Sequence, residues 1–213
     1  MSTVVLLFLS GCAPPAPEAD GPIADVAPVV DAASADPVVA EAQAAQEALT
    51  AAQGAARKLG TSLKGRLSSA MQSDGPKGAV TACADEAQGM TALATAGSRA
   101  RAGRAALKLR NPANANAPEW VKQWLDEQGH RSAEGVRGIS ETHRDGDAMV
   151  ARVLKPIPVE GVCLTCHGDP AAIPEEVKAA LAERYPADQA TGYALGDLRG
   201  ALWAEARAPL DAP

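Results

Sequence analysis

Apolar residues recur at three- and four-residue spacing over residues 38–71, which predicts a long helix with one apolar face. The recurring positions are Leu49, Ala52, Ala56, Leu59, Leu63 and Leu67. Asp74-Gly75-Pro76 interrupts this pattern, and a second helix is predicted from about Pro76 to Thr95. Its apolar face contains Val80, Cys83, Ala84, Ala87 and Met90. The folded chain is therefore expected to begin with two helices.

Shorter patterns follow in the second half of the chain. They predict a helix from Pro118, strands over 136–143 and 148–154, a helix over 173–185 and a strand over 198–206. Asp145-Gly146 is a tight-turn signal between the first two strands. Helices followed by antiparallel strands indicate one α+β domain over 38–206, with a tail over 207–213. Trp120 and Trp124, one helical turn apart, are expected in the core or at the edge of a cofactor.

Residues 1–12 have the pattern of a bacterial lipoprotein signal. A short apolar run leads into Leu9-Ser10-Gly11-Cys12, which resembles a lipobox whose cysteine is acylated. Residues 13–37 contain six prolines, five carboxylates and no basic residue, which is typical of a disordered tether. The alternative is an ordinary apolar N-terminus with an unrelated cysteine. We expect lipidation at Cys12, and hence a periplasmic protein anchored to a bacterial membrane.

Charge and composition narrow the functional classes. The chain carries a formal charge of −6, and most of this acidic excess lies in the predicted tether. The folded part is close to neutral and has no basic patch, so nucleic-acid binding is not expected. Aromatic residues make up 3% of the chain, so a core of Ala, Leu and Val would gain from a large planar cofactor.

Cys163-Leu164-Thr165-Cys166-His167 is a C-x-x-C-H motif, the pattern of c-type haem attachment. Two thiols at this spacing can form thioethers with the two vinyl groups on one porphyrin edge, and the histidine then supplies a nitrogen to the iron. A zinc site would need a second Cys/His pair at short spacing. A thioredoxin-like dithiol usually follows a buried strand and lacks the histidine. We therefore predict one covalent haem c on Cys163 and Cys166, with His167 as the proximal ligand.

Cys83 is the remaining cysteine once Cys12 is assigned to lipid and the motif to haem. It can be a small buried residue on its helix, or a thiolate bound to iron opposite His167. Spacing alone leaves other candidates for the sixth iron ligand: Met71, Met90, Met149, His130, His143, or no ligand at all.

Three stretches resemble one family of small bacterial haem c proteins, catalogued as a domain of unknown function. They are 108–114 with Pro118-Glu119-Trp120, Lys155-Pro156-Ile157 leading into 163–168, and 192–200. The family is known from cyanobacteria and from sensory regions of signalling proteins. The resemblance covers residues 40–206 and implies a PAS-like antiparallel sheet with flanking helices. It also implies that the iron is held by His167 and by a cysteine on an earlier helix, which is Cys83.

Three basic residues of these motifs have two interpretations: Lys108, Arg110 and Arg199. They can hold the haem propionates through charge-assisted hydrogen bonds. Alternatively, the two arginines can pair with Asp197 or Glu205 and stabilise the fold.

Two functions fit a haem with histidine and thiolate ligands. The thiolate opposes reduction, and it can leave on reduction to open a position for a gas such as CO or NO. This favours a redox or gas sensor, which would act on a signalling protein in trans because no output domain follows residue 206. The alternative is a low-potential electron carrier with a redox partner protein. No catalytic constellation is visible beyond the haem, so an enzyme is not expected; a homodimer through the long first helix is left open.

Overall fold

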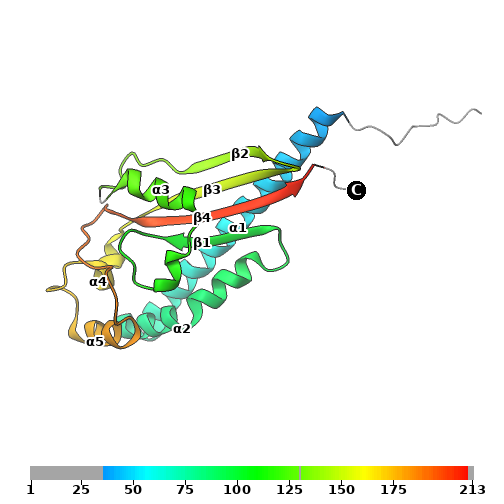
Figure 1. Ribbon diagram of the computed structural model, residues 1–213. Helices are drawn as coiled ribbons and strands as arrows, with labels where there is room; N and C mark the ends of the chain where they lie inside the picture. Colours follow the sequence, from blue (N-terminus) through cyan, green and yellow to red (C-terminus); the bar gives the residue numbers. More distant parts are fainter. Residues whose placement is uncertain (1–35, 130, 211–213) are drawn as a thin grey trace, which may run out of the picture. The chain divides into compact units, whose positions relative to one another are not determined.

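The computed structural model describes residues 36–129 and 131–210, which form one antiparallel sheet with helices packed around it (Figure 1). In chain order the elements are α1 (Pro37–Ser73), α2 (Gly75–Thr95), β1 (Ala100–Ala105), the 3₁₀ helix η1 (Pro112–Ala115), α3 (Glu119–Gln128), β2 (Ile139–Asp145), β3 (Ala148–Pro158), the 3₁₀ helix η2 (Gly161–Cys163), α4 (Leu164–His167), α5 (Glu175–Arg184) and β4 (Leu198–Pro209). The predicted lipobox with Cys12, nearly all of the predicted tether, and His130 lie outside the described residues. Within the described ranges, none of the helices has the length and apolar character needed to cross a membrane.

The sheet has the strand order β1-β4-β3-β2, and all neighbouring strands are antiparallel. β2 and β3 form the predicted hairpin, in which Asp145 pairs with Ala148. Gly146 in this turn has φ 64°, a conformation that glycine adopts without steric cost. β2 starts later than predicted, at Ile139, and β3 continues to Pro158 because β4 pairs with it along that length. The predicted α+β architecture, an antiparallel sheet with flanking helices and a long first helix, is confirmed.

β1 was not predicted from the sequence. Its six residues, ARAGRA, include no β-branched or aromatic side chain, so no strand propensity marks them. The strand forms because it pairs with residues 201–206 of β4 along its whole length. Gly103 is required at its centre, since a Cβ there would come within 2.9 Å of the Trp203 ring. Tertiary pairing therefore decides this element.

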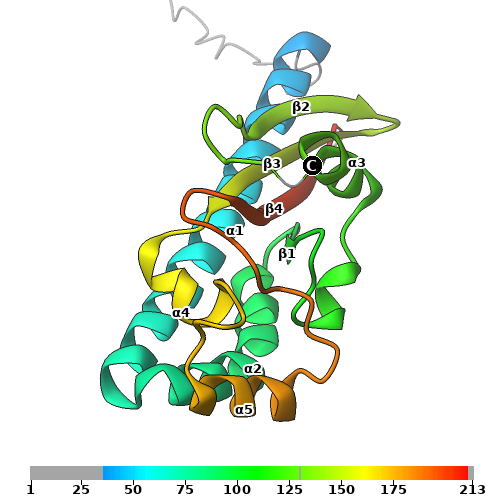
Figure 2. The same ribbon diagram turned by 90° about the vertical axis from the view of Figure 1, so that its left-hand side faces the viewer.

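The two faces of the sheet are covered by different helices (Figures 1 and 2). β4 shows this division, because alternate residues of a strand point to opposite faces. Leu202 and Ala204 belong to the core cluster built on the alanine-rich face of α1. Trp203 belongs to the cluster that contains Trp124 of α3, with Trp120 packed against it. Both tryptophans of α3 are thus part of the core, one of the two alternatives given above.

The helices α2, α4 and α5 lie near the end of β3 that is remote from the β2–β3 turn (Figure 2). α4 follows shortly after Pro158, and α5 packs on α2 through a cluster that includes Val80, Val177 and Leu181. This arrangement brings the C-x-x-C-H motif next to the helix that carries Cys83.

Candidate functional site

The C-x-x-C-H motif forms one compact turn made of η2 and α4. The amide of Cys163 donates to the Glu160 carbonyl at 2.9 Å, and the amide of Gly168 donates to the Leu164 carbonyl at 2.9 Å. A Cβ on Gly168 would lie 2.6 Å from that same oxygen, so glycine lets the chain turn away directly after the histidine. Cys163, Cys166 and also Cys83 are free thiols.

His167 is held in one orientation by its Nδ1, which lies 2.7 Å from the carbonyl oxygen of Ala190. A carbonyl only accepts, so Nδ1 donates the hydrogen and Nε2 keeps its lone pair. The Tyr193 ring meets the imidazole edge-on, with 6.3 Å between ring centroids. Burial lowers the pKa of His167 to about 3, and the charges of Arg110 and Arg199 act in the same direction. The imidazole is therefore neutral near pH 7 and suited to bind a metal through Nε2.

Arg110 connects the motif to two distant segments. Its guanidinium forms an ion pair with Asp188 at 3.0 Å and donates to the carbonyl oxygens of Cys166 and Ala190. The side chains of Arg110 and Asp188 are only 13% and 11% exposed, so this pair is partly shielded from water. Arg110, in the segment that follows β1, thus binds both the C-x-x-C-H turn and the Ala190 carbonyl that orients His167.

Lys108 and Arg199 contact the Tyr193 ring. The Lys108 Nζ lies 4.9 Å from the ring centroid and donates to the Thr191 carbonyl at 3.2 Å. The Arg199 guanidinium carbon lies 5.4 Å from the centroid, and its Nη1 donates to the Lys108 carbonyl at 3.1 Å. Within the described residues neither cation has a carboxylate partner, so both can still pair with an anion.

The predicted alternative, in which Arg110 and Arg199 pair with Asp197 or Glu205, is wrong. Asp197 accepts a hydrogen bond from the Ala194 amide at 2.7 Å and caps its own turn. Glu205 lies farther along β4, where it pairs with Arg101 of β1 at 2.6 Å. The physical reason is the length of β4, which carries Glu205 away from the end of the sheet where the motif lies.

Cys83 lies on α2, close to the C-x-x-C-H turn. Its neighbour Val80 belongs to a buried cluster, and both Ala84 of the same helix and Cys166 of the motif pack against that cluster. Burial raises the pKa of the Cys83 thiol, and the charges of Arg104, Arg110 and Arg66 act against this rise. Burial also raises the pKa of the Cys166 thiol, and a negative charge on Cys83 would raise it further. The fold therefore brings together two cysteines that are far apart in the sequence.

The other candidates for a sixth ligand have different surroundings. Met71 packs beside a small alanine cluster near the α1–α2 turn, and Met149 lies in the core beneath α1. His143 is on β2, opposite Val150 of the hairpin. Met90 lies on α2, about two turns after Cys83.

Arg104 of β1 was not identified from the sequence. Its Nε is buried and has no hydrogen-bond partner among the described residues. Burial lowers its pKa, whereas the nearby Cys83 and Tyr185 act to raise it. A buried guanidinium without a partner is costly, so an anion at this place would stabilise it. The sequence did not indicate that Arg104 could bind an anion, because β1 itself carries no strand signal.

A cavity of about 400 Å³ lies on this side of the protein, lined by residues that include Ala84, Arg110 and Tyr185. Among residues 36–129 and 131–210, no group of three or more His, Cys, Asp or Glu side chains could hold a metal ion by itself. The residues present do fit the predicted haem: two thiols on one turn, a neutral imidazole, a third thiol on α2, and the unpaired cations Arg104, Lys108 and Arg199 for its carboxylates.

Comparisons with known proteins give one family and one similar solved structure. The family model Tll0287-like matches residues 33–205. The crystal structure of the cyanobacterial heme-protein Tll0287 is similar to this chain at 24% identity, covering 79% of this chain and 90% of that chain, with a TM-score of 0.48. None of the curated proteins with which the chain was compared matches it.

Proposed function

Since the chain belongs to the Tll0287-like family, we propose that it is a c-type haem protein that carries one haem on Cys163 and Cys166. The observation that supports this best is the orientation of His167, whose Nδ1 donates to Ala190 and whose Nε2 keeps its lone pair. When bound, the haem supplies an iron that changes its oxidation state. The chain contributes the two thiols, a neutral imidazole and the cations around Tyr193.

Acid–acetone extraction tests the covalent attachment. The haem should stay on the purified wild-type chain, whereas a Cys163→Ser/Cys166→Ser variant should lose it or contain none. Cys83→Ser serves as the matched control, because it removes a thiol from the same site and should keep the haem attached. Haem that is extracted from the wild-type protein would overturn the proposal.

We propose Cys83 as the second iron ligand. Its position beside the C-x-x-C-H turn supports this, as do Arg104 and Arg110, whose charges favour the thiolate form. Cys83→Ala should give a high-spin or water-ligated ferric spectrum. It should also raise the midpoint potential, because a negative ligand that opposes reduction is gone. Thr81→Ala, a substitution at an exposed position of the same helix, should leave the ferric spectrum and the midpoint potential unchanged. If Cys83→Ala also leaves both unchanged, the proposal is contradicted, and Met90 and His143 are the next residues to substitute.

For the biological role we propose a membrane-anchored periplasmic redox or gas sensor that acts on a signalling protein in trans. Burial raises the pKa of the Cys83 thiol, which supports a ligand that takes up a proton and leaves when its bond to the metal weakens. Absorption spectra of the reduced protein with CO and NO test this. A sensor should bind these gases readily, with a structural change.

The second candidate is a low-potential electron carrier with a redox partner protein. The bonds that hold His167 and Arg110 in place support it, because a rigid site exchanges electrons with little reorganisation. In that case the reduced protein should keep His167 and Cys83 as iron ligands and bind no CO.

A further inference from the structure

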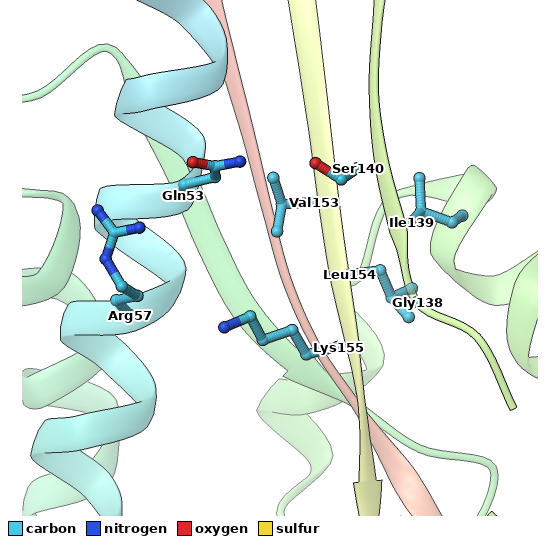
Figure 3. Close-up of a pocket in the computed structure, with 8 residues that line it drawn as sticks. All are labelled: Gln53, Arg57, Gly138, Ile139, Ser140, Val153, Leu154 and Lys155. Carbon is cyan, nitrogen blue, oxygen red and sulfur yellow. The ribbon is translucent and has the colours of Figure 1, made fainter. Parts of the chain in front are cut away.

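A second cavity, of about 410 Å³, lies between α1 and the β2–β3 hairpin and shares no lining residue with the site described above (Figure 3). Gln53 and Arg57 form its helix side, and the sheet side consists of Gly138, Ile139, Ser140, Val153, Leu154 and Lys155. A Cβ on Gly138 would come within 2.2 Å of the Leu154 carbonyl, so glycine lets the chain before β2 lie directly on β3 here. The volume falls in the range of small-molecule sites, about 300–1,000 Å³.

Two cations line this cavity and no carboxylate does. Neither Arg57 nor Lys155 forms an ion pair or a side-chain hydrogen bond with any residue in the described ranges. Three arginines elsewhere on the sheet differ, since Arg144, Arg152 and Arg207 each pair with a carboxylate. Figure 3 shows Lys155 reaching from β3 toward α1, on the side where Arg57 lies. The cavity therefore concentrates positive charge without a counter-ion from the part of the chain that the structure describes.

Neutral and apolar groups complete the lining. The Gln53 amide and the Ser140 hydroxyl extend toward each other across the cavity, and neither has a hydrogen-bond partner among the described residues (Figure 3). Val153 is buried on the face of β3 that α1 covers and forms an apolar floor, whereas the Leu154 side chain belongs to the core on the opposite face. A matching ligand would have anionic groups for the two cations and a short apolar body between them.

We propose that this cavity binds a small organic dicarboxylate, with Arg57 and Lys155 as its charge partners. Gln53 and Ser140 would donate hydrogen bonds to the carboxylate oxygens. Inorganic phosphate lacks the apolar body, and a monocarboxylate of the same size leaves one cation without a partner.

Isothermal titration of the purified holoprotein with succinate tests the proposal, with its uncharged analogue succinamide and with inorganic phosphate as comparison probes. Succinate should bind and succinamide should not. Arg57→Gln and Lys155→Gln should each weaken binding by roughly tenfold, and the double variant should abolish it. Lys77→Gln/Arg99→Gln is the matched control, because it removes the same charge from exposed positions outside the cavity and should bind as the wild-type protein does.

Three results would overturn the proposal. They are no heat with succinate, equal affinity for phosphate or succinamide, and unchanged affinity in the Arg57→Gln/Lys155→Gln protein. All four substituted side chains are exposed, so the variants should fold, and their circular dichroism and melting temperatures check this.

Discussion

At the scale of single residues, Arg104 combines a buried Nε that has no hydrogen-bond partner in the described residues with a position near Cys83. Removing a positive charge near Cys83, the proposed iron ligand, would favour the oxidised state, so Arg104→Met should lower the midpoint potential of the haem protein. The expected shift is on the order of tens of millivolts, where about 59 mV corresponds to a tenfold change for one electron. Redox titration measures it.

The control for this prediction is Arg99→Met, which removes an exposed arginine just before β1. Its potential should stay at the wild-type value. An equal shift in both variants would show that net charge, and not the position of Arg104, determines the potential.

At the scale of elements, the motif turn depends on Gly168, where α4 ends. Gly168→Ala places a methyl group against the Leu164 carbonyl, which a Cβ would approach to 2.6 Å. We expect a loss of about 1–3 kcal/mol in the free energy of unfolding and a lower yield of attached haem. Denaturant unfolding and haem content per chain are the measurements.

Gly161→Ala is the matched control on η2, because nothing lies within 4 Å of a Cβ at that position. It should keep wild-type haem content and stability. Full haem attachment in the Gly168→Ala protein would contradict a requirement for this close approach.

Glu205 connects β4, one of the two inner strands of the sheet, to three neighbouring elements. It pairs with Arg101 of β1 at 2.6 Å and Arg152 of β3 at 3.5 Å, and it accepts a hydrogen bond from Trp120 of α3 at 2.9 Å. Burial acts to raise its pKa, but the bonds from Arg101 and Trp120 lower it below the usual 4.5. Because the folded-state pKa is the lower one, the stabilisation is complete above about pH 4.5 and is lost as the pH falls through the folded value.

Glu205→Gln should therefore be less stable than the wild type near neutral pH, by about 1–3 kcal/mol. The difference should shrink as the pH falls below 4.5. Urea unfolding over a pH series tests this, with Glu141→Gln as a control at the more exposed partner of Arg152. A difference that does not change with pH would contradict a role for the carboxylate charge.

At the scale of the whole molecule, the lipobox predicts where the protein is found. Cys12→Ser should move the protein from the membrane to the soluble periplasmic fraction, because the acylated thiol is the proposed anchor. Cell fractionation and intact-mass measurement check this. A wild-type protein that is soluble and carries no lipid would contradict the anchor.

The sequence by itself determined the elements that carry local signals. The apolar face of α1, the break at Asp74-Gly75-Pro76, and the Asp145-Gly146 turn were all visible as short-range patterns, and the structure has them near the predicted residues. The C-x-x-C-H motif was visible for the same reason, since its chemistry depends on residues within one turn of backbone. Composition also argued against nucleic acid as a partner, because the predicted folded part is close to neutral and has no basic patch.

Only the tertiary structure decided which distant residues complete the candidate site. β1 has no signal of its own and forms because β4 pairs with it, and this strand carries Arg104 toward Cys83. The ion pair of Arg110 with Asp188 and the carbonyl that orients His167 join segments separated by long stretches of sequence. Such contacts depend on how the sheet and helices pack, and packing is a property of the whole chain that no local pattern encodes.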